Sequence, residues 1–151
     1  MNSRVQSIKN IIKENPEALL ILSNGLTSRE AAYFIPNDRS FYMLHGMGES
    51  LAVGIGFAKA KPSQLVVVID GDYNAIMGLS SWSLMPCSNL KYYVLDNGIS
   101  ETTGGQLLPN LPFVPEWCNV ISVEPGKEVT PNPPSPFETW SKCRRWLNEL
   151  V

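Results

Sequence analysis

Short runs of apolar residues alternate with amphipathic stretches along this chain. The runs have the length of buried β-strands, and they span residues 18–23, 40–44, 64–70, 90–96 and 119–126. The stretches between and around them repeat apolar residues at helical spacing. They predict helices over 3–14, 28–34, 49–60, 75–85 and 137–150. Strands that alternate with helices predict an α/β fold, in which a doubly wound parallel sheet carries helices on both faces.

Individual residues predict where some of these helices begin, end and face. Thr27 or Ser28 can cap the second helix, and Pro86 stops the helix over 75–85. In the C-terminal helix the expected inward-facing residues are Phe137, Trp140, Trp146 and Leu147. The helix over 49–60 is rich in glycine and alanine. It either packs closely against another backbone, such as a partner's, or fills the core of its own domain.

Composition narrows the classes of function. The chain has 151 residues, 44% of them apolar, and a net charge of −2, which suits one domain with a sizeable core. The chain has no excess of basic residues, which argues against nucleic acid as its main partner. No apolar run approaches the roughly 20 residues of a membrane span. We therefore expect a cytoplasmic protein with three free thiols, at Cys87, Cys118 and Cys143. Because the chain has a single histidine, His45, it cannot form a multi-histidine metal site by itself.

Four polar stretches follow the first four predicted strands, where parallel folds bind ligands. They are NGLTS (24–28), HGMG (45–48), DGDYN (70–74) and DNGISETTGGQ (96–106). Asp70, Asp72, Asp96 and Asn97 supply oxygen ligands that favour Mg²⁺ or Ca²⁺ over zinc. DGDYN also leads into a helix, whose free N–H groups suit a phosphate. The pattern indicates a magnesium-bound phosphorylated ligand; alternatively, Asp70 and Asp72 are ordinary turn and cap residues.

At this point the sequence resembles a known family. Gly71-Asp72-Tyr73, with Asn97 25 residues after Asp72, is similar to the Gly-Asp-Gly…Asn magnesium-diphosphate motif of thiamine-diphosphate enzymes. GLTSRE (25–30), HGMGESLAVGIG (45–56) and DNGISETTGGQ resemble further segments of decarboxylases in this family. The resemblance covers about residues 18–126. It is strongest to phosphonopyruvate decarboxylases and to the small β-type subunit of split sulfopyruvate decarboxylases.

The resemblance implies a role for each matching residue. Asp72, the Asn97 side chain and the Ile99 carbonyl would bind Mg²⁺, while Gly71, Tyr73 and Asn74 would hold the diphosphate of thiamine diphosphate. Met47 would lie under the bend of the cofactor, and the His45 carbonyl would accept a hydrogen bond from its aminopyrimidine. Gly25 and Thr27 would touch the diphosphate.

The chain also departs from the family pattern. Tyr73 replaces the last glycine of Gly-Asp-Gly, which is compatible with phosphate binding if Tyr73 starts a helix with negative φ. His45 replaces a common glycine and is a weak candidate for a catalytic base. Glu49 is either an acid over the cofactor or a residue that complements the helix dipole. Arg29 is the one candidate cation at this rim for an anionic substrate end.

The resemblance further implies that half of the active site is absent. The family's activating glutamate belongs to a pyrimidine-binding domain, which nothing in this sequence resembles, and we expect residues 1–151 to form a single diphosphate-binding domain. We therefore expect an α-type partner subunit in an α2β2 or larger assembly. The implied activity is decarboxylation of a phosphonopyruvate- or sulfopyruvate-like 2-oxo acid to an aldehyde and CO2. The alternatives are another split thiamine-diphosphate enzyme, such as an acetolactate-synthase-like carboligase, and a non-catalytic subunit that binds a phosphorylated ligand.

Overall fold

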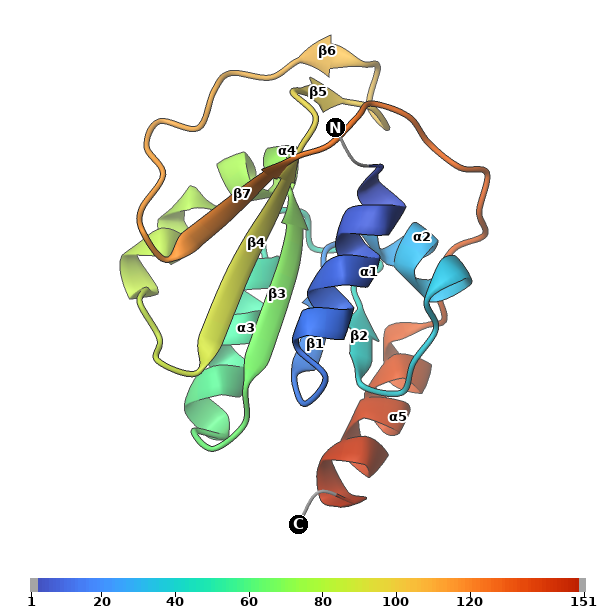
Figure 1. The fold of residues 1–151 in the computed structure, drawn as a ribbon, viewed down its shortest axis with the longest axis vertical. Coiled ribbons are helices and arrows are strands. Elements are labelled where there is room, and N and C mark those ends of the chain that lie inside the picture. The colour runs from blue at the N-terminus through green and yellow to red at the C-terminus, as the bar shows by residue number, and fades with distance from the viewer. Residues whose placement is uncertain (1–2, 150–151) are drawn as a thin grey trace.

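A five-stranded parallel sheet forms the centre of the computed structural model, which describes residues 3–149 (Figure 1). The strands lie in the order β2-β1-β3-β4-β7. In that order they span Ser40–Tyr42, Leu19–Leu22, Val66–Gly71, Leu90–Asp96 and Cys118–Ser122. The predicted α/β fold with a parallel sheet is confirmed.

Helices cover both faces of this sheet, because both faces of its central strands are apolar. Figure 1 shows α1 (Arg4–Glu14) in front of the sheet and α3 (Ser50–Ala60) behind it. Leu20 and Leu22 of β1 pack in the core cluster with α1 and with Ala31 of α2 (Leu26–Phe34). Leu19 and Ile21 pack in the cluster on the opposite face with α3 and α5 (Pro136–Glu149).

The strand order determines where a ligand can bind. The chain runs from β1 outward to β2 and then crosses to β3 on the other side of β1. Such a reversal leaves a crevice at the carboxyl ends of the two strands. The segments that follow β1 and β3 therefore lie together at one rim of the sheet, as the sequence predicts.

The helix predicted over 75–85 is wrong in its extent. The chain instead forms α4 (Asp72–Met77) and a 3₁₀ helix, η1 (Leu79–Leu84), separated by Gly78. A Cβ atom at position 78 would lie 2.3 Å from the carbonyl oxygen of Gly48. The turn at Gly48 thus packs directly on the backbone of Gly78, and this long-range contact marks the break between the two helices.

The predicted cap of α2 is also wrong. The helix begins at Leu26, and its N-cap is Gly25, with φ of 86° and no side chain to accept a hydrogen bond. Ser28 Oγ instead donates to the carbonyl oxygen of Leu22 at 2.9 Å. Ser28 therefore ties α2 to β1 from within the first turn.

The C-terminal helix buries a different face from the predicted one. Its buried residues are Thr139, Cys143 and Leu147. Leu147 is confirmed, and Trp146 is partly buried against the core. Phe137 is 80% exposed and Trp140 is 37% exposed, so these two inward predictions are wrong. The small Thr139 and Cys143 side chains let the helix approach the sheet, and Trp140 packs at its margin on Phe57.

Two other segments differ from prediction. The loop over 97–107 contains a small antiparallel hairpin, formed by β5 (Ile99–Ser100) and β6 (Gln106–Leu107). The fifth strand ends at Ser122 rather than at residue 126. Pro125, inside the predicted range, has no backbone N–H to donate to a neighbouring strand. Within residues 3–149, no helix has the length and apolar character needed to cross a membrane. The three cysteines are free thiols, as predicted.

Two glycines of α3 lie in different surroundings. A Cβ atom at Gly54 would lie 2.2 Å from Cγ2 of Val68 on β3, so Gly54 permits close packing of α3 on its own sheet. A Cβ atom at Gly56 would meet nothing within 4 Å. Packing within the domain therefore explains Gly54 and leaves Gly56 on the exposed face of the helix.

Candidate functional site

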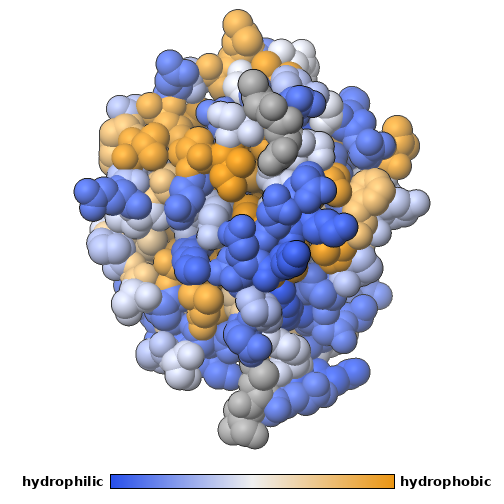
Figure 2. Space-filling view, in the orientation of Figure 1, coloured by the Kyte–Doolittle hydropathy of each residue, from blue (hydrophilic) through white to orange (hydrophobic). Residues whose placement is uncertain are grey.

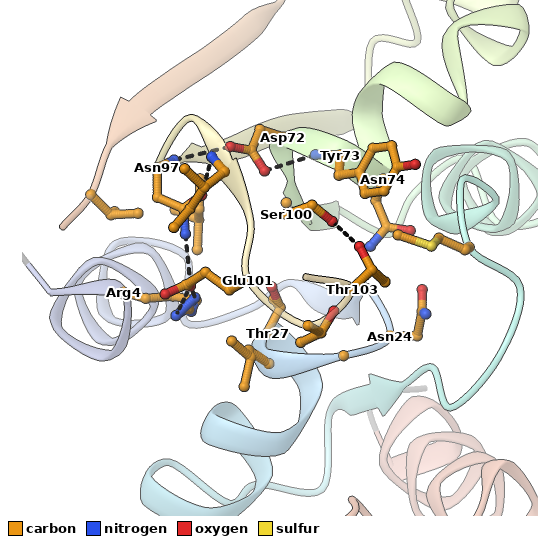
Figure 3. Close-up of a pocket in the computed structure, with 18 residues that line it drawn as sticks. Arg4, Asn24, Thr27, Asp72, Tyr73, Asn74, Asn97, Ser100, Glu101 and Thr103 are labelled. Atoms are coloured by element: carbon orange, nitrogen blue, oxygen red, sulfur yellow. Dashed lines mark hydrogen bonds and ion pairs between the residues drawn. The ribbon is translucent and has the colours of Figure 1, made fainter. Parts of the chain in front are cut away.

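A pocket of about 240 Å³ opens at the rim between β1 and β3 (Figure 3). The structure brings nine of the ten predicted cofactor-binding residues together around it. These are Gly25, Thr27, Met47, Gly71, Asp72, Tyr73, Asn74, Asn97 and Ile99. His45 and Glu49 are exposed and do not line the pocket, and Arg29 does not line it either.

Asp72 joins two rim segments at the centre of this pocket. Its Oδ1 accepts a hydrogen bond from the Tyr73 N–H at 2.8 Å. Its Oδ2 accepts from the N–H groups of Asn97 at 3.1 Å and Gly98 at 2.9 Å. Burial raises the pKa of Asp72 to about 6, with Asp96 adding to the increase and the backbone donors opposing it.

The amide of Asn97 has a defined orientation. Its Oδ1 accepts from the Ile99 N–H at 3.1 Å, and its Nδ2 donates to Glu101 Oε2 at 2.7 Å. An amide oxygen accepts two hydrogen bonds or ligand contacts. Oδ1 therefore retains one lone pair for a cation.

The chemistry of these donors fits Mg²⁺. Asp72 supplies a carboxylate and Asn97 an amide oxygen, which are the hard ligands that Mg²⁺ prefers. Among residues 3–149, Asp72 has no ion-pair partner, whereas Arg4 is paired with Glu30 and Glu101. The described residues hold no group of three or more acidic, cysteine or histidine side chains that could bind a metal alone. A cation here would complete its shell with a carbonyl oxygen, water and ligand phosphate.

The backbone beside Asp72 leaves room for a ligand. Tyr73 lies in the first turn of α4, and within the described chain only glycines have positive φ. Tyr73 therefore lies at the start of a helix with negative φ, which is the condition stated above for phosphate binding at this position. A Cβ atom at Gly71 would meet nothing within 4 Å, so the space over this residue is open to the pocket.

Met47 is held in place by the turn around it. Gly46 and Gly48 have φ of 79° and 86°, and a Cβ atom at Gly48 would lie 3.0 Å from the Met77 carbonyl carbon. The Gly48 N–H donates to Asn74 Oδ1 at 2.8 Å. The turn is thereby attached to α4, and Met47 reaches the pocket.

Asp70 was expected among the rim ligands, and this prediction is wrong. Its side chain is only 1% exposed and lies beneath the rim. Its Oδ2 accepts from Ser50 Oγ at 2.6 Å and from the Tyr92 hydroxyl at 2.9 Å. Burial raises the pKa of Asp70 to about 6. Because side chains alternate along a strand, Asp70 points into the core below α3 and attaches the start of that helix to the sheet.

Apart from Asp72, the charged residues that line the pocket are Arg4 and Glu101, and sequence reasoning assigned a role to neither. Arg4 lies four residues before Ile8 on the buried stripe of α1 and is itself 7% exposed. A charge on an apolar stripe is the signal that could have revealed a buried ion pair. Glu101 lies inside the polar stretch over 96–106 that the sequence placed at the rim of the sheet, but nothing local indicated its partners.

Comparisons with known proteins agree with this geometry. Residues 23–120 match the family of the thiamine pyrophosphate enzyme C-terminal TPP-binding domain. Phosphonopyruvate decarboxylases of Streptomyces hygroscopicus and Streptomyces viridochromogenes are 39% and 36% identical over 80% of this chain. The match covers 32% of each enzyme, so the chain spans about a third of their length.

A second kind of relative has a length closer to that of this chain. The sulfopyruvate decarboxylase subunit beta of Methanocaldococcus jannaschii is 38% identical over 80% of this chain and 68% of that subunit. The site residues from Gly25 to Asn97 all fall inside the family match. The chain therefore belongs to the thiamine pyrophosphate enzyme family and carries its C-terminal, TPP-binding domain.

Proposed function

We propose that this chain is the cofactor-binding β subunit of a split thiamine-diphosphate-dependent decarboxylase. One observation carries the proposal: Asp72 and Asn97 are hydrogen-bonded to each other and line one pocket within a TPP-binding domain. The likeness to a sulfopyruvate decarboxylase subunit beta and to phosphonopyruvate decarboxylases supports it. The substrate class is then a 2-oxo acid with a phosphonate- or sulfonate-like end, and the products are an aldehyde and CO2.

The residues of this chain would bind and orient the cofactor. Asp72, Asn97 and the Ile99 carbonyl would hold Mg²⁺, while the N–H groups beside Gly71 would hold the diphosphate. Met47 would support the cofactor from below, and the exposed His45 would contribute only its main-chain carbonyl. When bound, thiamine diphosphate supplies the carbon nucleophile and the electron sink that decarboxylation requires.

Activation of the cofactor is assigned to a partner subunit. Of the described residues that line the pocket, only Asp72 and Glu101 are acidic, and both carboxylates accept several hydrogen bonds. Neither is available to protonate the aminopyrimidine, so the activating glutamate is proposed on an α-type subunit, in an α2β2 or larger assembly.

An exposed apolar surface is available for such a subunit. Leu107, Phe113 and Val114 are 84%, 60% and 54% exposed. They lie at and after β6, and Figure 2 shows apolar surface on the side where Figure 1 draws the segment between β6 and β7. Exposed apolar surface of this kind suits burial in an assembly.

The anionic end of the substrate also needs a cation from elsewhere. Arg4 is the one cationic side chain among the described residues that line the pocket. Its guanidinium is already shared between Glu30 and Glu101. A free arginine or lysine for a phosphonate or sulfonate is therefore proposed on the partner.

A melting experiment on the full chain tests the cofactor site. Thiamine diphosphate and Mg²⁺ together should raise the melting temperature of the wild type, since a ligand that binds only the folded state stabilises it. D72A should lose this increase, and D38A, which removes an exposed aspartate, should retain it. An equal increase in D72A would contradict the proposal.

Product analysis on the complex with its partner then tests the reaction. Sulfopyruvate and phosphonopyruvate should give aldehyde and CO2. Carbon–carbon bond formation from pyruvate would instead identify a carboligase, and absence of turnover despite cofactor uptake would identify a non-catalytic binding subunit.

A further inference from the structure

We propose that Glu101, anchored by Arg4, is a positioning residue that sets the orientation of the Asn97 amide toward the metal. The inference rests on the proposed function, because it assigns a task at the same site. Arg4 lies outside the matched family segment of residues 23–120. Figure 3 shows Arg4, Glu101 and Asn97 in a row beside Asp72.

The first step is the set of partners around Glu101. Its Oε2 accepts from Arg4 Nη1 at 2.8 Å, from Arg4 Nη2 at 2.9 Å and from Asn97 Nδ2 at 2.7 Å. Its Oε1 accepts from the backbone N–H of Gly126. Every one of these neighbours is a donor, so this position requires a carboxylate, which only accepts.

The second step follows from the two unlike ends of an amide. Because Glu101 Oε2 can only accept, it selects the NH₂ end of Asn97. The carbonyl end must then point away from Glu101, and Oδ1 does so, toward the Ile99 N–H at 3.1 Å. A reversed amide would place Oδ1 against Glu101 Oε2 and turn the NH₂ group toward a cation. Glu101 thus presents the oxygen of Asn97 as the metal ligand.

The third step is how Glu101 itself is held. Arg4 is 7% exposed, and its Nε donates to Glu30 at 3.1 Å while Nη2 also donates to the carbonyl oxygen of Gly126. Arg4 and Glu101 are 97 residues apart in the sequence. The guanidinium therefore attaches the hairpin loop to α1 and to the segment after β7. Residues that orient metal ligands in this way alter metal affinity by roughly 10- to 100-fold when they are replaced.

A matched pair of substitutions tests the assignment. E101Q and E30Q each convert one carboxylate partner of Arg4 into an amide, but only Glu101 contacts Asn97. The dissociation constant of Mg²⁺ is measured by calorimetry at saturating thiamine diphosphate, and the urea midpoint is measured without ligands. We expect Mg²⁺ affinity to fall about 10-fold in E101Q and by less than about 2-fold in E30Q, even if E30Q is the less stable protein.

Comparing the two measurements separates orientation of Asn97 from general destabilisation. E30Q also removes a carboxylate partner of Arg4 but leaves the contact with Asn97 in place. A loss of Mg²⁺ affinity confined to E101Q, with urea midpoints that do not follow the same order, therefore does not come from loss of stability.

The outcomes separate this inference from the proposed function. Equal losses of Mg²⁺ affinity in E101Q and E30Q overturn the positioning role. The proposed function survives that result if D72A still abolishes cofactor uptake. Uptake that is unchanged in D72A overturns both.

Discussion

Oδ1 of Asn74 accepts a 2.8 Å hydrogen bond from the backbone N–H of Gly48, which lies 26 residues earlier in the chain. Asn74 is 7% exposed, and its contact joins the turn before α3 to the first turns of α4. Both segments line the pocket, through Met47 and through Tyr73. The turn before α3 and the start of α4 are therefore joined into one wall of the pocket.

Replacing Asn74 by alanine should destabilise this wall. N74A leaves the Gly48 N–H buried without a partner, which costs about 1–3 kcal/mol. Urea unfolding measures the loss, and N10A, at an exposed position of α1, should change stability by less than about 0.5 kcal/mol. Equal effects of the two substitutions would show that the Gly48 contact does not stabilise the fold.

Two glycines of α3 should respond in opposite ways to alanine. G54A places a methyl group 2.2 Å from Val68 Cγ2, so α3 must move off the sheet at a cost of about 1–3 kcal/mol. G56A meets open space and should stabilise the helix by about 0.5–1 kcal/mol. Denaturant midpoints check both values, and a destabilising G56A would contradict the exposed position of this residue.

Asp70 should make the stability of the unliganded protein decrease as pH rises. Its folded pKa is about 6, above the ordinary value of 3.8, so the folded state binds the proton more tightly than the unfolded state does. This contribution is fully present below about pH 4 and is lost as pH rises through about 6. Asp72, whose pKa is raised in the same direction, contributes with the same sign.

The difference between D70N and the wild type isolates that contribution. D70N should flatten the decrease of the urea midpoint between about pH 4 and pH 7. Asp72 still titrates in D70N, so D70N/D72N should flatten it further. Parallel curves for the wild type and D70N would show that the Asp70 proton is not linked to folding.

Metal uptake should depend on pH through Asp72. The pKa of this carboxyl group is about 6, and a metal ligand must be deprotonated to bind. Mg²⁺ affinity should therefore be constant above pH 7 and fall by up to about 10-fold per unit below pH 6. Calorimetric titrations across this range, with thiamine diphosphate saturating, measure the dependence. An affinity that does not change with pH would rule out the Asp72 carboxylate as the group that binds the ion.

Gly71 should be needed for the ligand but not for the fold. G71A adds a methyl group where the protein has nothing within 4 Å, and φ of −95° is accessible to alanine. The melting temperature without ligand should stay within a few degrees of the wild-type value. Thiamine diphosphate affinity should fall, because the methyl group occupies the space proposed for the diphosphate. Wild-type affinity in G71A would place the diphosphate elsewhere.

Patterns among residues that are close in the sequence predicted most of the fold and much of the site. The strand over 90–96 has the predicted bounds, and α1 and α3 each begin one residue after their predicted start. Buried strands and amphipathic helices are recognised by the periodicity of adjacent side chains, so these features are readable locally. The rim could also be predicted, because all parallel strands end on the same side of the sheet. That rule placed four polar stretches at the rim, and the resemblance to thiamine-diphosphate enzymes named, within them, nine residues that line one pocket.

Contacts between segments that are far apart in the sequence determined the remaining features of the fold and the site. Packing of Gly48 on Gly78 marks the division of one predicted helix into two, and close approach of α5 to the sheet buries Thr139 and Cys143 in place of Phe137. The Arg4–Glu101 pair joins residues 97 positions apart, and no local pattern indicates its partner. Periodicity shows which face of an element is apolar, but the partner of a polar group depends on which segments the folded chain brings within hydrogen-bonding distance.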